Sequence, residues 1–363
     1  GTGVWTPPHK VSNEEIVSSF NEYVRLFNTE NANQIEAGSI MALEPSSTEF
    51  IEKASGIKSR YVIEKESLLD PTRMKPQIEP RSDDVLSLCA EISVIAAKEA
   101  LDNAGLDASD IDAVIVSTAN LQRAYPAIAI EVQHELGIEG YAYDMMVGCS
   151  STTFGISNAY SDIVAGKASK ILVINPEITT AHNNYKNRDS HFIFGDVCTA
   201  AVIEKNSKSP NKFKIINAKL KTHFSNNIRN NFGFMNAIEN KNYSEEELLF
   251  VQNGRSVFKE VMPMVASLIT NHLEENKLSP QDVEQYWLHQ ANINMNTYVV
   301  KKLLGENFPP ERAPNVLDEY ANTGSAGSLI SFHKYNHLQP GQKGIICSFG
   351  AGYSICSILV EKA

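Results

Sequence analysis

The chain of 363 residues contains no apolar run that approaches about 18 residues, the length a helix needs to cross a membrane. Its start lacks a basic segment followed by a short apolar stretch, so we expect no secretory signal and a cytoplasmic protein. Positive charge is in deficit, because 32 Lys and Arg face 43 Asp and Glu for a net charge of −11. A duplex-binding protein needs a basic face, so the charge balance argues against general nucleic-acid binding.

The sequence also lacks cysteine pairs at the spacing of metal ligands. Its five cysteines are Cys89, Cys149, Cys198, Cys347 and Cys356. An odd number of widely spaced cysteines without a CxxC pair predicts free thiols, with neither a disulfide framework nor a zinc site.

The composition that remains is that of a globular protein, with 42% apolar and 21% charged residues. The length is about twice the usual ~150 residues of one domain, which predicts two modest domains or one large duplicated unit.

An internal repeat favours duplication. Leu101 aligns with Leu273 at an offset of 172 residues, and both lie at the end of a predicted helix that precedes a strand. The same offset aligns Thr153 with Ser325. A shift that holds across separate segments predicts two similar halves, which we place at residues 1–205 and 206–363.

Helices and strands are expected to alternate along both halves. Apolar periodicity predicts helices over 84–104 (capped by Ser82 or Asp83), after Cys149, over 251–275 and over 294–304, and strands over 112–117, 170–175, 199–204, 285–289, 344–348 and 354–361. This order predicts an α/β fold of mixed or parallel sheets covered by helices. Segments 21–47 and 222–244 have no counterpart in the other half, so they are insertions that either cap a pocket or form plain surface excursions.

Cys149 is the candidate nucleophile. It follows an apolar run and precedes a segment with helical periodicity, so its thiol is expected at a helix N-terminus, where the dipole favours the thiolate. The alternative is an inert packed cysteine. The other four cysteines lie within helix or strand runs and are expected to be structural.

His289 and Asn322 are the candidate partners. His289 ends a predicted strand in WLHQAN, a common place for sites in α/β folds, although a packed histidine is the alternative. Asn322 lies in YANTGSAGS and could equally belong to an ordinary turn. The 172-residue offset places Asn322 beside Ala321, the counterpart of Cys149, so both half-sites are expected to face one pocket. Gly350 and Gly352 permit close backbone approach that could aim an N–H at an oxyanion, or they form a tight hairpin.

Five motifs together resemble the β-ketoacyl-acyl-carrier-protein synthase III family of thiolase-fold condensing enzymes. They are VGCSS around Cys149, FIFGDV at 192–197, HQAN at 289–292, ANTGSAGS at 321–328 and FGAGY at 349–353. The resemblance covers nearly the whole chain. It implies a duplicated five-layer αβαβα fold, a homodimer, an acyltransferase of fatty acid biosynthesis, and no cofactor besides the thioester substrates.

The resemblance also implies a role for each site residue. Cys149 would carry the acyl group, and His289 and Asn322 would hold the thioester carbonyl of malonyl-acyl-carrier-protein while carbon dioxide leaves. The backbone N–H groups of Cys149 and Ala351 would form the oxyanion hole. These types suit the chemistry, because a thiolate exchanges acyl groups readily and two neutral donors stabilise an enolate.

Substrate and carrier contacts follow from the same resemblance. The implied substrate-binding residues are Tyr125, Arg188, Phe50 and Met146, and the implied carrier-docking residues are Lys259, Lys301 and Lys302. Tyr125 would cap the acyl pocket of a second subunit or simply pack at the interface. The paired lysines could instead be a solvated helix face.

Several positions depart from the family pattern. The aromatic residue that stacks on coenzyme A adenine falls at Phe50 in place of Trp, its neighbouring Arg falls at Ala54, and a carrier-docking Arg falls at Asn294. The primer is therefore either a short acyl-coenzyme A or a longer chain, from coenzyme A or a carrier protein.

The sequence leaves other function classes open. One alternative is an acyltransferase or condensing enzyme of a secondary pathway. Another is a cysteine hydrolase, since Cys, His and Asn occur in this order in papain-like proteases. A third is a non-catalytic binding protein.

Overall fold

The computed structural model describes all 363 residues, and its first sheet has five strands. In spatial order they are β1 (Thr2–Trp5), β7 (Val197–Glu204), β6 (Lys170–Glu177), β4 (Ala113–Ser117) and β5 (Tyr141–Met145). β4 is parallel to β5 and β6, whereas β7 is antiparallel to β1 and β6. Helices α5 (Leu88–Ala104) and α6 (Ile128–Leu136) cover one face of this sheet through a buried apolar cluster.

The second sheet has four strands. Their order is β11 (Val283–Leu288), β12 (Lys343–Gly350), β13 (Gly352–Lys362) and β8 (Phe213–Ser225). β11 and β12 are parallel, and the other neighbours are antiparallel. Helices α8 (Gly254–Glu275) and α9 (Ile293–Leu304) cover its outer face.

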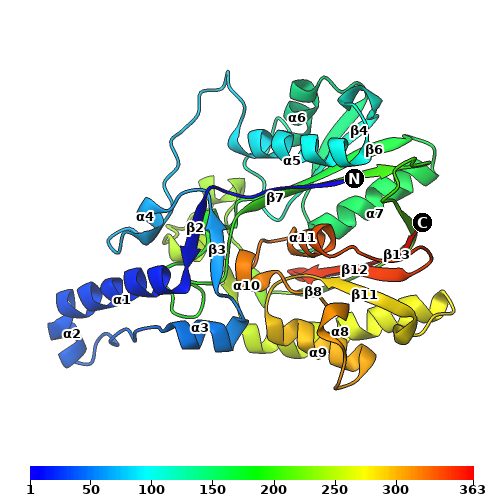
Figure 1. Cartoon of the computed structure of the whole chain (residues 1–363). Helices are drawn as coiled ribbons and strands as arrows, with labels where there is room; N and C mark the ends of the chain where they lie inside the picture. Colours follow the sequence, from blue (N-terminus) through cyan, green and yellow to red (C-terminus); the bar gives the residue numbers. More distant parts are fainter.

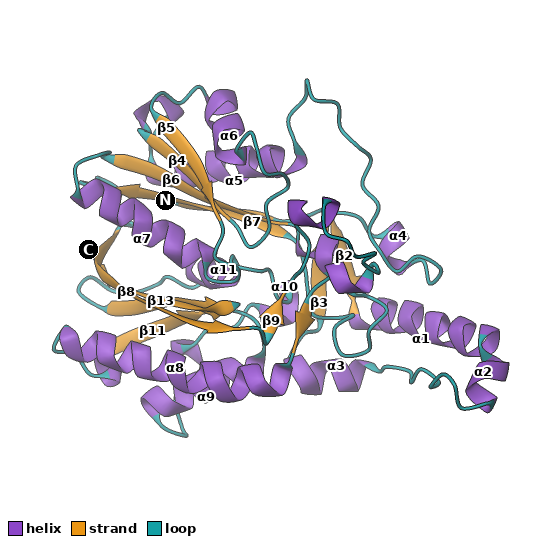
Figure 2. Cartoon of the chain, turned by 180° about the vertical axis from the view of Figure 1, so that it is seen from behind, coloured by secondary structure: helices purple, strands orange, loops and turns teal.

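Two helices lie between the sheets, as Figures 1 and 2 show. They are α7 (Ser151–Val164) and α11 (Gly327–Lys334). Their apolar side chains, such as Ile156 and Leu329, share one buried cluster with both sheets. The order of layers is therefore helix, sheet, helix, sheet, helix, which confirms the predicted αβαβα fold.

A hydrogen bond joins the beginnings of the two central helices. The hydroxyl groups of Thr152 on α7 and Ser325, just before α11, lie 2.8 Å apart, and both side chains are buried. The predicted repeat offset aligns Ser325 with Thr153, the residue after Thr152.

The remaining elements are short or lie outside the five layers. They are α1 (Asn13–Glu30), α2 (Ala32–Glu36), α3 (Thr48–Ser55), α4 (Glu66–Leu69), α10 (Leu317–Tyr320), β2 (His9–Ser12), β3 (Ser59–Val62), β9 (Ile228–Arg229), β10 (Val251–Gln252) and the 3-10 helices η1 (Ala108–Asp110), η2 (Thr179–His182), η3 (Phe234–Ala237), η4 (Glu246–Leu248), η5 (Pro280–Asp282) and η6 (Pro310–Arg312). No helix combines the length and apolar character needed to span a membrane.

Segment 21–47 forms an arm that projects from the layers (Figure 1). It comprises the second part of α1, the helix α2 and an extended return. Asn28 exchanges two hydrogen bonds with the backbone of Leu43, and Asn21 exchanges two with Ser46, so the return is fastened along α1.

Segment 222–244 includes the end of β8, then β9 and η3. Asn227 in this segment donates hydrogen bonds to the hydroxyl of Tyr353 and to Glu260, which ties the segment to the FGAGY motif.

Two predicted helix starts are wrong. The helix predicted from Asp84 begins at Leu88, because the hydroxyl of Ser87, and not Ser82 or Asp83, accepts the N–H of Ala90 as an N-cap. The helix predicted from Val251 begins at Gly254, because Val251 and Gln252 form strand β10 against β9.

Candidate active site

Cys149 lies two residues before the start of α7, and the end of strand β12 in the second sheet contacts it there. A Cβ on Gly350 would lie 2.5 Å from the Cβ of Cys149 and 3.0 Å from its Sγ, so only a glycine fits there. The backbone N–H of Ala351 points at the thiol and lowers its pKa. Of the five cysteines, Cys149 alone is not fully buried. Cys149 is thus a partly exposed residue whose thiol is buried against the end of the second sheet.

The pKa of Cys149 departs from the expectation based on the helix terminus. Burial and, to a smaller extent, the negative charge of Glu177 raise the pKa to about 11, although the N–H groups of Ala351 and Cys149 act to lower it. The expectation of a favoured thiolate is therefore wrong for the free protein. Desolvation outweighs the helix terminus and the two N–H donors.

His289 follows β11 and is 2% exposed. Its ring packs edge-on against Phe349, with centroids 5.3 Å apart, and Phe349 directly precedes Gly350. His289 and Cys149 therefore flank the same end of β12. Burial lowers the pKa of His289 to about 4, so its imidazole is neutral at physiological pH.

Asn322 is held from both sides by backbone contacts. Its N–H donates to the carbonyl of Ile193, and its carbonyl accepts the N–H of Gly195, which joins the ANTGSAGS and FIFGDV motifs. Its side-chain Oδ1 accepts the N–H of Gly324 at 3.1 Å. Gly327, the first residue of α11, lies so close to Gln290 that a Cβ there would be 2.8 Å from the Gln290 Cβ, so the beginning of α11 packs against the HQAN motif.

The structure thus brings the three candidate residues to one region of the molecule. Phe349 and Gly350 link His289 to Cys149, and α11, which follows the Asn322 loop, packs against the residue after His289. That the three side chains face one pocket stays a prediction.

Glu177 is a residue that the sequence analysis missed. It ends β6, is 0% exposed, and accepts hydrogen bonds from the N–H of Ala119 and from both the N–H and hydroxyl of Ser325. Burial raises its pKa to about 7. The sequence feature that could have identified Glu177 is its place at the end of the mostly apolar strand ILVINPE. A carboxylate buried at such a position is a candidate for a functional site.

Two of the predicted substrate-binding residues contact each other. The guanidinium of Arg188 lies 4.1 Å from the ring centre of Phe50, and its Nε donates to the carbonyl of Pro45 at 2.8 Å. Pro45 belongs to the fastened arm, so the arm holds Arg188 on the Phe50 ring. Tyr125 and Met146 are apart from this pair and are 84% and 58% exposed.

The three predicted docking lysines lie on the outer helices α8 and α9. Lys301 forms an ion pair with Glu306 at 2.7 Å. Lys302 lies 5.6 Å from the ring centre of Tyr298, which packs on Phe258 beside Lys259. Lys259 and Lys302 therefore flank one aromatic contact between the two helices.

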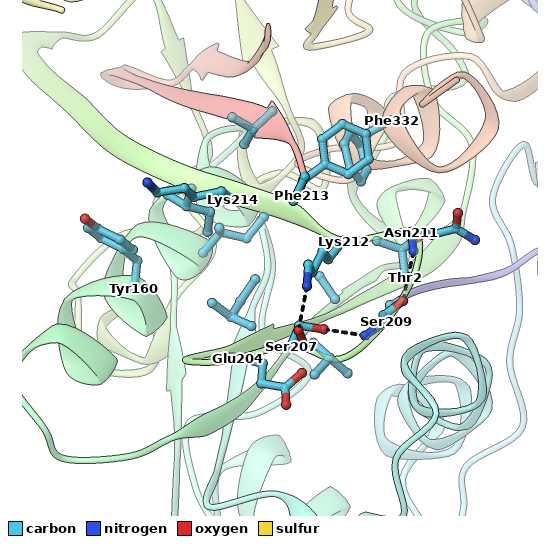
Figure 3. Close-up of a pocket in the computed structure, with 18 of the residues that line it drawn as sticks. Thr2, Tyr160, Glu204, Ser207, Ser209, Asn211, Lys212, Phe213, Lys214 and Phe332 are labelled. Atoms are coloured by element: carbon cyan, nitrogen blue, oxygen red, sulfur yellow. Dashed lines mark hydrogen bonds between the residues drawn. The ribbon is translucent and has the colours of Figure 1, made fainter. Parts of the chain in front are cut away.

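A cavity of about 1000 Å³ lies elsewhere (Figure 3). On α7 it is lined by Ile156, Tyr160, Ile163 and Val164, toward the end of the helix away from Cys149. None of the predicted site residues lines it, so we do not assign the active site to this cavity.

Comparison with known proteins matches two parts of the chain to one family. Residues 143–223 match the 3-oxoacyl-[acyl-carrier-protein (ACP)] synthase III family, and residues 273–362 match its C-terminal domain. The two matches contain Cys149 and His289 with Asn322, respectively.

Solved structures agree over the full length. The chain superimposes on 3-oxoacyl-[acyl-carrier-protein] synthase III from Aquifex aeolicus with a TM-score of 0.76 and 23% identity, covering 99% of this chain and 98% of that one. The priming β-ketosynthase of the R1128 polyketide pathway gives a TM-score of 0.78 at 23% identity, with 100% and 95% covered. These likenesses establish the fold.

Sequence relatives are more specific. The chain is 53% identical over 349 residues to the beta-ketodecanoyl-[acyl-carrier-protein] synthase of Pseudomonas aeruginosa, which covers 95% of this chain and 100% of the relative. It is 28% identical over 320 residues to the beta-ketoacyl-[acyl-carrier-protein] synthase III of Methylococcus capsulatus, with 87% and 91% covered. The chain therefore belongs to the β-ketoacyl-acyl-carrier-protein synthase III family, the thiolase-fold condensing enzymes that act as acyltransferases in fatty acid biosynthesis.

Proposed function

We propose that this enzyme loads a medium-chain acyl group on Cys149 and condenses it with malonyl-acyl-carrier-protein. The observation that carries the proposal is the contact between the two repeat units at the sulfur, where Gly350 lies against Cys149 and the Ala351 N–H points at it. A nucleophile with a prearranged backbone donor suits acyl transfer, because charge develops on the carbonyl oxygen of the thioester.

In the first half-reaction, the sulfur of Cys149 attacks the carbonyl carbon of the incoming thioester. The N–H groups of Cys149 and Ala351 stabilise the oxyanion, the donor thiol leaves with the proton of Cys149, and the acyl group remains as a thioester on the enzyme.

In the second half-reaction, the malonyl carboxylate leaves as carbon dioxide and its electron pair passes into the enolate. His289 and Asn322 donate hydrogen bonds to the enolate oxygen, a role supported by the neutral imidazole. The enolate carbon then attacks the acyl-Cys149 carbonyl, the Cys149 thiolate leaves, and a 3-oxoacyl chain on the carrier is released.

The relative from Pseudomonas aeruginosa supports an eight-carbon primer. The name of that relative gives a beta-ketodecanoyl group as its product, and a condensation adds two carbons to the primer. Because the two proteins are 53% identical over the whole length of the relative, we propose the same acyl chain length for the present enzyme.

A panel of acyl thioesters tests the loading step. We expect octanoyl-coenzyme A or octanoyl-carrier to acylate Cys149 at least about tenfold faster than acetyl-coenzyme A, as mass spectrometry of the peptide containing Cys149 would measure. Cys149→Ala should abolish the adduct because it removes the nucleophile. Equal labelling of the wild type and Cys149→Ala would contradict the assignment, and a preference for acetyl groups would contradict the chain length.

The two half-reactions should separate by mutation. His289→Ala or Asn322→Ala should leave acylation of Cys149 within about threefold while lowering carbon dioxide release from malonyl-carrier by about a hundredfold or more, because each removes one donor to the enolate. Measuring adduct formation and decarboxylation in the same preparations checks this. Loss of both steps to the same extent would indicate misfolding or a different role.

We propose that the carrier protein docks on the outer helices through Lys259, Lys301 and Lys302. Their exposure on α8 and α9 supports this role, as does the absence of an ion pair for Lys259 and Lys302. A positive patch attracts an acidic carrier and speeds its association.

Charge reversal tests the docking surface. Lys259→Glu combined with Lys302→Glu should raise the KM for malonyl-carrier by about tenfold, with less change at high salt, because the pair would repel an acidic carrier. Acylation of Cys149 by acyl-coenzyme A should be unchanged. Lys98→Glu on α5, which covers the other sheet, is the matched control, and an equal effect from this control would refute the surface.

We also propose a homodimer. Strand β5 is an edge strand with one side unpaired, and exposed apolar residues lie near it on the same repeat unit, namely Tyr125, Ile130 and Met146. Exposed strand edges and apolar patches favour association with another chain.

Sedimentation at micromolar concentration should therefore give the mass of two chains. Tyr125→Ala should lower the octanoyl preference if Tyr125 caps the acyl pocket of the partner, with acetyl loading as the control. A monomer at these concentrations would contradict the dimer.

A further inference from the structure

The buried carboxyl group of Glu177 has no part in the reaction described above, yet it lies between both repeat units of the active site. It is 0% exposed and ends β6 in the first sheet. Its Oε1 accepts the N–H of Ala119 at 3.0 Å, the N–H of Ser325 at 3.1 Å and the hydroxyl of Ser325. A buried carboxylate without a cation is costly, so its retention needs an explanation.

Ser325 connects Glu177 to both catalytic segments. It stands three residues after Asn322, and its hydroxyl also lies 2.8 Å from that of Thr152 in the first turn of α7, three residues after Cys149. Glu177 therefore anchors the Asn322 loop of one repeat unit to the nucleophile helix of the other.

The second carboxyl oxygen faces the same loop. Oε2 has no hydrogen-bond partner, and a Cβ on Gly324 would lie 2.5 Å from it. Gly324 has a φ of +59°, and the N–H of this residue binds the side chain of Asn322. The loop conformation that directs Asn322 thus depends on a glycine that leaves room for the Glu177 carboxyl.

The charge of Glu177 acts mainly on neighbouring thiols. It raises the pKa of Cys89, Cys149 and Cys198, and no cation is among the groups that shift its own pKa. The other buried carboxylate nearby, Asp196, is bound by Thr180 and by the N–H of Ile63, and is not among the groups that shift the pKa of Cys149. The pKa of His289 is lowered by burial alone.

We propose that Glu177 is a positioning residue of the condensing reaction, which holds the Asn322 loop against the Cys149 helix through Ser325 and sets the charge that the thiol faces. The inference rests on the proposed function for the roles of Asn322 and Cys149. It predicts two separable effects. The charge of Glu177 lowers the reactivity of the Cys149 thiol, and the hydrogen bonds between Glu177 and Ser325 support decarboxylation.

Glu177→Gln tests the charge, because the amide keeps an oxygen acceptor and loses the negative charge. Burial raises the pKa of Glu177 to about 7, so the wild-type carboxyl is protonated below that pH and ionised above it. At pH 6 both proteins should react with iodoacetamide at the same rate. At pH 8.5 the variant should react about threefold faster, since its thiol pKa is lower and part of the gain is offset by weaker nucleophilicity.

Asp196→Asn is the matched control, since it also removes a buried negative charge. It should leave the rate ratio between pH 8.5 and pH 6 at the wild-type value. Cys149→Ala reports any reaction at the four buried cysteines. A ratio for Glu177→Gln that equals the wild-type ratio would overturn the charge effect.

Ser325→Ala tests the geometry by removing the hydroxyl that binds Glu177 and contacts Thr152, while the Ser325 N–H still binds Glu177. It should lower decarboxylation of malonyl-carrier by about tenfold while acylation of Cys149 stays within about twofold of wild type. Glu177→Gln should retain decarboxylation within about threefold, because its acceptor oxygen still binds Ser325. Equal losses in both half-reactions of Ser325→Ala, or an unchanged decarboxylation rate, would overturn the positioning role.

The outcomes separate this inference from the proposed function. If no thioester acylates wild-type Cys149, the proposed function fails, while the alkylation measurement still reports the effect of Glu177 on the thiol. If the wild type condenses normally and neither variant shows its expected change, only the role of Glu177 fails.

Discussion

The active region depends on the close approach of the β12–β13 turn to the beginning of α7. Gly350 fits against Cys149 only because it has no side chain, and the next residue then directs its N–H at the sulfur. This contact joins strands β12 and β13 of the second sheet to helix α7, which follows strand β5 of the first sheet. A change in how the two sheets pack would therefore displace Cys149, because close-packed interiors transmit small displacements.

The central helices α7 and α11 maintain that packing. Both are buried between the sheets, and their apolar side chains belong to one cluster with residues of both sheets. Thr152 and Ser325 add a polar contact at the beginnings of the helices, where Glu177 also binds. The layer that supports the fold is thus the layer that positions Cys149 and the Asn322 loop.

Burial has a common effect on the titratable groups of this region. It raises the pKa of Cys149 and Glu177 and lowers that of His289, so all three are shifted toward their neutral forms. A neutral site suits a reaction in which hydrogen-bond donors stabilise a transient oxyanion, since fixed dipoles in a dry site act more strongly than in water. The thiol must lose its proton as the substrate reacts, and the N–H groups of Cys149 and Ala351 assist this loss.

The sequence by itself predicted the α/β fold, because apolar periodicity is a local feature of the chain, and its short motifs made Cys149, His289 and Asn322 candidates. It misplaced the start of α5, because Ser82 and Asp83 could cap a helix as well as Ser87 does, and the start of α8, because Val251 and Gln252 pair with β9 instead. Only the tertiary structure decided the protonation of Cys149, the contact of Arg188 with Phe50, and the place of Glu177. Each of these depends on desolvation and on contacts between residues far apart in the chain, which no local pattern records.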